Sequence, residues 1–163
     1  MQPEEYGVMF RVDETRWWYQ TLHRLIFQTL ETELPGWVRK EILDAGCGTG
    51  SILKQLGNAE KTIGVDLAPE AVSFCWQRGL NNVHHADICA LPFANASFDI
   101  AICSSVLYHR LVKDPAVAVR ELHRVLRPGR LAWPSWRQPG NKAPAIVMEF
   151  RSESNVSAFT ALG

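Results

Sequence analysis

The residues best placed to do chemistry are an acid and three glycines in one short stretch. Asp44-Ala45-Gly46-Cys47-Gly48-Thr49-Gly50 follows a short apolar run. Glycines at alternate positions permit positive φ angles and let the backbone approach a ligand without a Cβ in the way. The residues after Gly50 predict a helix whose unpaired N–H groups would face the same ligand. A tight turn without a ligand is the plain alternative.

Two further aspartates narrow the class of ligand. Asp66 ends a predicted strand, where its carboxylate can accept hydrogen bonds from both ribose hydroxyls of an adenosine. Asp87 closes the next predicted strand and is placed to reach an adenine amino group. The alternatives are a surface or helix-capping role for Asp66 and a loop-capping role for Asp87. With the glycine turn, these acids predict a site for an adenosine-containing ligand.

His109 is the best candidate for a general base, should the reaction need one. It follows the fourth predicted strand, beside Tyr108. A histidine that only packs or hydrogen-bonds is the alternative. His84 and His85 are neighbours on a strand and so point to opposite faces. With no other cluster of ligating residues in the sequence, we predict no metal site.

These residues are positioned by strands that alternate with helices. We expect strands at residues 41–45, 62–66, 83–86 and 98–103, and the start of a fifth near Arg130. We expect helices at residues 14–33, 49–56, 69–79 and 114–126. This alternation predicts an α/β fold with a mostly parallel sheet and helices on both faces. Right-handed crossovers then bring the carboxyl ends of the strands to one edge, where ligands bind.

Composition limits the other functions. A chain of 163 residues predicts one domain. The net charge of zero provides no field that favours nucleic acid or an anionic membrane. No apolar run is long enough for a membrane span, and the first residues do not form a signal peptide. The four cysteines form no Cys-x-x-Cys pair, which predicts reduced thiols in a cytoplasmic protein.

Taken in order, the motifs resemble those of a known family. Residues 43–50, 64–70, 86–88 with 91–93, 97–99 and 122–129 resemble the class I methyltransferases of the broad type often called methyltransferase type 11. The resemblance covers about residues 40 to 130. It implies a Rossmann-like three-layer sandwich, S-adenosylmethionine as the cofactor and S-adenosylhomocysteine as the product.

The resemblance also implies roles for the glycine loop. Gly46, Gly48 and Gly50 would line the methionine and ribose part of the cofactor, and Ala45 and Cys47 belong to the same binding loop. The first acid of the loop, Asp44, would act on the cofactor amino group, directly or through water.

The remaining implied contacts come from the ends of the strands. Asp66 would take the ribose hydroxyls, with Leu67 against the adenine. Asp87 and Ile88 would frame the base, and Ser104 would lie near the methionine end.

An aromatic segment precedes the glycine loop. Arg16-Trp17-Trp18-Tyr19 resembles a subgroup whose aromatic helix lies across the site as a cover. Packing of Trp17 and Trp18 against the sheet is the alternative, and one ring could serve each role. We therefore divide the single domain into a helical cover segment (1–40), a cofactor-binding core (41–135) and an atypical tail (136–163).

The tail departs from the family pattern. Prolines at 134, 139 and 144 disfavour a central strand after Gly129, although residues 145–151 could form a short strand or helix. We expect the last strands of the seven-stranded family sheet to be missing. The C-terminal third is then truncated or read out of its ancestral register, or the chain is a minimal variant. The exposed sheet edge would favour a homodimer.

Three functions follow from this sequence. The first is a methyltransferase acting on a small-molecule or sugar-type acceptor. The second is a cofactor-binding module without turnover, because the substrate side of the fold is incomplete. The third, a dinucleotide-dependent oxidoreductase, is disfavoured, since the loop reads Gly-x-Gly-x-Gly rather than Gly-x-Gly-x-x-Gly.

Overall fold

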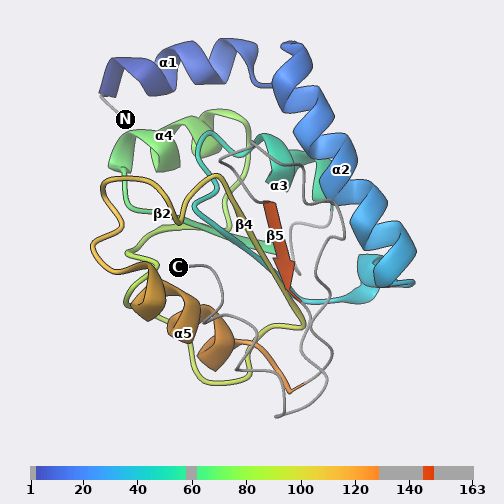
Figure 1. Ribbon diagram of the computed structural model, residues 1–163. Helices are drawn as coiled ribbons and strands as arrows, with labels where there is room; N and C mark the ends of the chain where they lie inside the picture. The colour runs from blue at the N-terminus through green and yellow to red at the C-terminus, as the bar shows by residue number, and fades with distance from the viewer. Residues whose placement is uncertain (1–2, 58–61, 129–144, 149–163) are drawn as a thin grey trace.

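A five-stranded sheet forms the centre of the protein (Figure 1). The computed structural model describes residues 3–57, 62–128 and 145–148. The strands are β1 (Ile42–Ala45), β2 (Thr62–Asp66), β3 (Val83–His85), β4 (Ile100–Ser104) and β5 (Ala145–Met148), in the order β3-β2-β1-β4-β5. The first four are parallel, and β5 pairs antiparallel with β4. The predicted mostly parallel sheet is confirmed.

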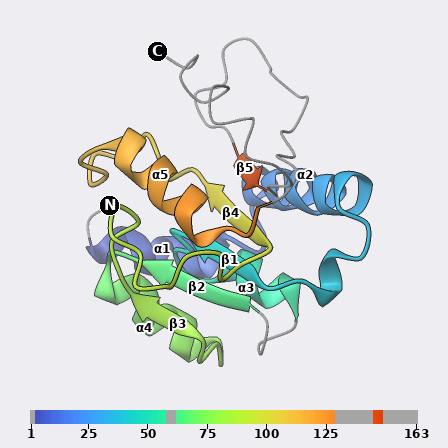
Figure 2. The ribbon, with the colours of Figure 1, turned by 90° about the horizontal axis from the view of Figure 1, so that it is seen from below.

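Helices cover both faces of this sheet. They are α1 (Pro3–Val12), α2 (Trp17–Glu33), α3 (Ser51–Leu56), α4 (Pro69–Gln77) and α5 (Pro115–Val125), with a short 3-10 helix η1 (Trp37–Arg39). Figure 2 shows α5 on the opposite side of the sheet from α3 and α4. The three-layer Rossmann-like architecture expected from the sequence is confirmed.

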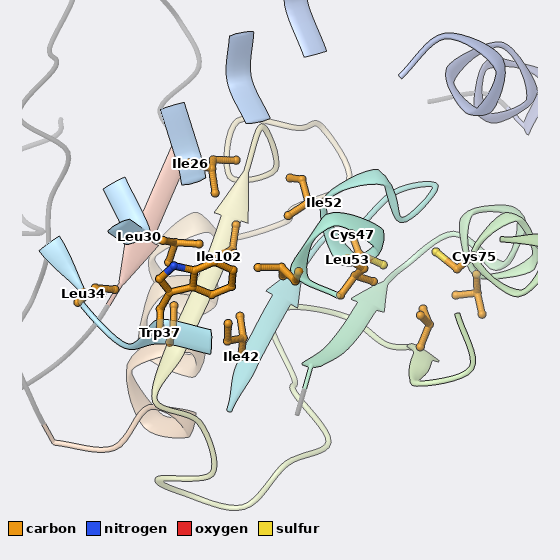
Figure 3. Packing of buried hydrophobic residues seen from close by; sticks show 14 residues of the cluster. Ile26, Leu30, Leu34, Trp37, Ile42, Cys47, Ile52, Leu53, Cys75 and Ile102 are labelled. Carbon is orange, nitrogen blue, oxygen red and sulfur yellow. The ribbon is translucent and has the colours of Figure 1, made fainter. Parts of the chain in front are cut away.

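Alternation along the strands sorts the apolar side chains into two cores. On one face Ile42 and Ile102 pack with side chains of α2, among them Ile26 (Figure 3). On the other face Leu43 of β1 packs with Leu122 of α5. Successive strand residues point to opposite faces, so Asp44 shares the face of Ile42 and lies on the side of α2 and α3.

Two helices begin where proline and capping signals place them. Asp114 caps α5, because its side chain accepts hydrogen bonds from the backbone N–H of Ala116 (2.9 Å) and Val117 (3.1 Å). Pro115 and Pro69 stand at the starts of α5 and α4.

The N-terminal region differs from the prediction. The helix expected from Glu14 begins at Trp17, because residues 13–16 form a turn that ends the separate helix α1. In this turn the backbone N–H of Asp13 bonds the carbonyl of Met9 (2.8 Å), and that of Arg16 bonds Val12 (2.8 Å). The turn directs the Asp13 side chain inward, where it is fully buried. Helix α1 itself was not predicted.

Several predictions concern the C-terminal part. The fifth strand near Arg130 and most of the tail lie outside the described residues. Within the segment 145–151, residues 145–148 form the strand β5, one of the two expected alternatives. Association of two copies through a sheet edge stays a prediction. No helix in the described part of the chain is long and apolar enough to cross a membrane, and the four cysteines are free thiols.

Candidate functional site

A cavity of about 390 Å³ lies where the parallel strands end, within the size range of small-ligand sites. Its walls come from the segments after β1, β2, β3 and β4, and from α1 and α2. In Figure 1, α1 crosses above the ends of the strands. Most of the predicted site residues line it: Gly46, Cys47, Gly48, Asp66, Leu67, Asp87, Ile88, Ser104 and His109. The other three, Asp44, Ala45 and Gly50, do not belong to its lining.

Two glycines of the loop lie against side chains that leave no room for a Cβ. Gly46 has φ +85°, and a Cβ there would be 2.3 Å from a methyl carbon of Val106. Gly48 has φ +55°, and its Cβ would be 2.9 Å from Cε of Met9. The loop therefore needs glycine for its backbone conformation and for close approach.

Gly50 differs from the other two glycines. It also has a positive φ (+82°), but a Cβ there would meet Leu80 at 2.6 Å and the Cys75 sulfur at 2.9 Å. These residues belong to α4 and the turn after it. The geometry therefore gives Gly50 a role in packing the loop onto α4.

Asp66 connects the second strand to the glycine loop. Its Oδ2 accepts a hydrogen bond from the Gly48 N–H (2.9 Å), and its Oδ1 accepts one from the Ala68 N–H (2.9 Å). Each carboxylate oxygen can accept a second hydrogen bond, so both can still receive a hydroxyl. Burial raises the pKa of Asp66, and the two N–H donors oppose that shift. The Asp66 carboxylate thus accepts hydrogen bonds from nearby backbone N–H groups and also lines the cavity.

Asp87 also combines these two roles. Its Oδ1 accepts a hydrogen bond from the Cys89 N–H (2.8 Å), and the residue lines the cavity.

Asp44 lies behind the cavity lining. Burial, together with the charge of Asp66, raises the pKa of Asp44 to about 7. Its Oδ2 and the Oγ of Ser104 are buried, and neither has a hydrogen-bond partner among the described residues. Such atoms mark positions where a polar ligand group or water can bind.

The cover helices contribute aromatic and aliphatic side chains. Tyr6 and Met9 of α1 line the cavity, as do Trp18 and Tyr19 of α2. Trp18 is 40% exposed, and Trp17, outside the cavity, is 72% exposed. Neither ring therefore packs as a core residue against the sheet.

A buried ion pair holds this cover to the glycine loop. Arg78, after α4, donates to both carboxylate oxygens of Asp13 (2.6 and 2.7 Å) and to the carbonyl of Thr49 (2.6 Å). The Thr49 hydroxyl donates to Asp13 Oδ2 (2.5 Å). The guanidinium also lies over the Phe10 ring, 4.4 Å from its centroid. These contacts connect the end of α1, the loop and α4.

The tyrosines and histidines that line the cavity differ in their protonation near neutral pH. Burial raises the pKa of Tyr6 to about 12 and also raises that of Tyr19, so both phenols stay protonated near neutral pH. Burial lowers the pKa of His23 and of His109, which favours neutral rings. His109 Nδ1 accepts the Leu111 N–H (3.3 Å), so a neutral ring carries its proton on Nε2.

Several cavity residues were missed by the sequence reasoning. Helix α1 has local sequence signals of a helix: Pro3 and acids in its first turn, Arg11 in its last turn, and apolar residues at helical spacing. His23, Ser51 and Ser105 carry no local motif. Ser105 has φ +62°, an unusual backbone conformation for serine that the sequence does not reveal.

Comparisons with known proteins find similar methyltransferases. A family model described as "Methyltransferase domain" matches residues 43–133. A "Probable S-adenosylmethionine-dependent methyltransferase" of Mycolicibacterium smegmatis is 30% identical over 71% of this chain and 44% of that protein. A "Ubiquinone biosynthesis O-methyltransferase" of Idiomarina loihiensis is 27% identical over 79% of this chain and 58% of that protein.

Two further similarities are to a curated relative and to a solved structure. A "Probable tRNA methyltransferase 9B" of Mus musculus is 35% identical over 63% of this chain and 22% of that protein. A solved methyltransferase structure from Methanococcus maripaludis has a TM-score of 0.62 at 17% identity, covering 78% of this chain and 60% of that one, and supports the fold. The chain thus spans less than two thirds of the length of each of these curated relatives.

Proposed function

The chain belongs to the methyltransferase domain family, whose model matches more than half of its length, and on that premise we propose that it methylates a small-molecule acceptor. The cofactor of this family is S-adenosylmethionine. The observation that carries the proposal is that Gly46, Gly48, Asp66 and Asp87 line one cavity. The four free cysteines also support the cytoplasmic location that we infer from the sequence.

The residues of the cavity fit this cofactor. Asp66 and Asp87 present carboxylate oxygens, the acceptors that ribose hydroxyls and an adenine amino group require. The unpartnered oxygen of Asp44 suits an ammonium group, which can only donate hydrogen bonds. Gly46 and Gly48 also line the cavity, and Val106 and Met9 pack where their Cβ atoms would be.

Bound S-adenosylmethionine supplies a methyl group already activated by its sulfonium. The protein therefore contributes orientation and exclusion of water rather than activation. The cover can serve both tasks, because Tyr6 lies near Asp66, Met9 lies against Gly48, and Trp18 also lines the cavity. Arg78 holds this cover closed through Asp13.

We place the acceptor over β4, on the opposite side of β1 from Asp66 and Asp87, because the strand order is β3-β2-β1-β4. Much of the cavity lining is aromatic or aliphatic, including Trp18, Tyr19, Leu22, Tyr108, Leu111 and Val112. Such a surface favours a small, largely apolar or planar acceptor.

Proton removal has few candidates in this cavity. The protonated phenols of Tyr6 and Tyr19 are poor bases near neutral pH. His109 stays our candidate for a general base, should the acceptor have to lose a proton. In the tautomer that its bond from Leu111 favours, the ring presents an N–H, so it would orient the acceptor before any proton is taken.

A nucleic-acid acceptor is the second candidate, since one relative is described as a tRNA methyltransferase. The zero net charge of the chain favours the small molecule, because binding to phosphate backbones depends on clustered positive charge. A binding module without turnover is the third.

Calorimetry and a substrate screen test the proposal in sequence. We expect binding of S-adenosylmethionine and S-adenosylhomocysteine but not of NAD. We expect Asp66→Ala to weaken that binding by about 1–3 kcal/mol. Release of S-adenosylhomocysteine is then followed with a panel of small acceptors and with tRNA. Absence of cofactor binding contradicts the proposal, and turnover only with tRNA replaces the acceptor class.

A further inference from the structure

The buried histidine of α2 makes two directed side-chain contacts. His23 is 5% exposed, its Nδ1 lies 2.7 Å from Gln55 Nε2, and its Nε2 lies 3.2 Å from Ser51 Oγ. A side-chain amide nitrogen only donates, so Nδ1 of His23 accepts. Burial lowers the pKa of His23, which favours the neutral ring. Its one proton is then on Nε2 and is donated to Ser51.

This arrangement sets the direction of the Ser51 hydroxyl. Ser51 is the first residue of α3, directly after the glycine loop, is 6% exposed and lines the cavity. A hydroxyl that accepts one hydrogen bond still has its own proton to donate. His23 therefore leaves Ser51 with a hydroxyl proton to donate, on a side chain that lines the cavity and whose rotation is restricted.

The strand order indicates which part of the cofactor would lie near this donor. Asp66 and Asp87, after β2 and β3, are the acceptors for the adenosine end. The amino-acid end then lies toward β1 and β4, on the side of α3. An amino acid carries an ammonium that donates and a carboxylate that accepts. The acceptor Asp44 and the donor Ser51 have the matching character.

We propose that Ser51, positioned by His23, donates its hydroxyl proton to the α-carboxylate of the bound cofactor. This inference rests on the function proposed above. Ser51 is the residue that contacts the ligand, and His23 is a positioning residue that acts through it. The chemistry selects a cofactor with an intact amino-acid carboxylate over one that lacks it.

Two ligands that differ only in that carboxylate test the contact. Binding of S-adenosylhomocysteine and of decarboxylated S-adenosylhomocysteine is measured by calorimetry. We expect Ser51→Ala to weaken the first by roughly 10- to 100-fold, the usual effect of losing a hydrogen bond to a charged group, and to leave the second unchanged. Thr29→Ala is the matched control, because it removes a buried α2 hydroxyl that bonds the Leu25 carbonyl (2.9 Å); it should leave both affinities unchanged.

Variants of the histidine separate positioning from simple packing. His23→Gln keeps a donor for Ser51 and should retain most of the discrimination between the two ligands. His23→Leu keeps the volume without the donor and should lose it. Imidazole nitrogen chemical shifts in the free protein should report the proton of His23 on Nε2.

The possible outcomes separate the two proposals. Equal effects of Ser51→Ala on both ligands, or a proton on Nδ1 of His23, overturn this inference while the proposed function stands. If the unmodified protein binds neither ligand, the proposed function itself fails.

Discussion

Asp44 and Ser104 face the same side of the sheet from neighbouring parallel strands, and each keeps one buried oxygen without a partner among the described residues. Asp44 is paired in register with Ile102, and Ser104 follows two residues later. Strand side chains alternate, so the two lie on one face. An unmet buried polar atom costs about 1–3 kcal/mol. A polar group that binds between these two buried oxygens should therefore add stability.

Cofactor binding should depend on pH through Asp44. The pKa of its carboxyl is about 7 in the free protein, and the ionised form is the better partner for a cofactor ammonium. Affinity for S-adenosylhomocysteine should therefore rise as pH increases through about 7 and level off above it. Calorimetry near neutral pH in two buffers of different ionisation heat should detect the released proton. Asp44→Asn should abolish both effects, and an unaltered pH profile in that variant contradicts this assignment.

The stability of the free protein should change with pH in the opposite sense. The pKa of Asp44 is raised in the folded state from its ordinary value of 3.8, so the folded protein binds more protons than the unfolded chain between about pH 4 and 7. The contribution of Asp44 to stability should fall as pH rises across this window and then stay level. Asp44→Asn should remove this loss of stability. At about pH 8 the variant should be more stable than the unmodified protein by on the order of 1–3 kcal/mol. Urea unfolding at both ends of the window measures it, and equal unfolding midpoints for the two proteins at high pH would contradict it.

The sequence predicted the parts of the site that depend on local order. A strand, a glycine turn and a helix follow one another within residues 42–56, so their geometry is a local property. That Asp66, at the end of β2, and Asp87, after β3, line one cavity could be predicted because parallel strands end at one edge.

Contacts between distant segments could not be predicted in this way. Arg78 and Asp13 are 65 residues apart, and His23 and Ser51 are 28 apart. No spacing rule connects such pairs. Gly50 resembles its neighbours in the motif, and only the position of α4 shows that it packs against Leu80.

Gly46→Ala should destabilise the protein more than an equivalent change elsewhere. Gly46 and Gly36 share φ +85°, but a Cβ at Gly46 would be 2.3 Å from Val106, whereas one at Gly36 meets nothing within 4 Å. Gly36→Ala should cost about 1–2 kcal/mol from backbone strain alone. Gly46→Ala should cost about 1–3 kcal/mol more from overpacking. Adding Val106→Ala to Gly46→Ala should recover part of the extra loss of stability, measured by thermal unfolding. If Gly46→Ala and Gly36→Ala destabilise the protein equally, Val106 does not restrict the space at Gly46.

Breaking the ion pair between Asp13 and Arg78 should weaken both stability and cofactor binding. The side chains of Asp13 and Arg78 are 0% and 6% exposed. Asp13→Asn removes the negative charge that faces the buried guanidinium, so it should lower the free energy of unfolding by about 3–5 kcal/mol. Glu14→Gln is the matched control, because Glu14 is 41% exposed and contacts the same arginine. Its cost should stay below about 1 kcal/mol. Chemical denaturation measures both variants. Similar costs would indicate that the buried pair does not hold the cover.

The role of His109 can be decided with two substitutions once an acceptor is known. Since Nδ1 accepts the Leu111 N–H, the neutral ring offers a donor at Nε2, and a glutamine can offer a similar donor. We expect His109→Gln to retain most of kcat/KM and His109→Phe to lose it by roughly 100-fold, the lower range for a positioned acid–base group. A general base gives a different result. Both variants would then be equally impaired, and kcat/KM of the unmodified enzyme would fall tenfold per pH unit below the pKa of His109, which burial lowers from its ordinary value of 6.5. The pH profile of kcat/KM, measured with the unmodified enzyme and His109→Gln, therefore separates orientation of the acceptor from removal of its proton.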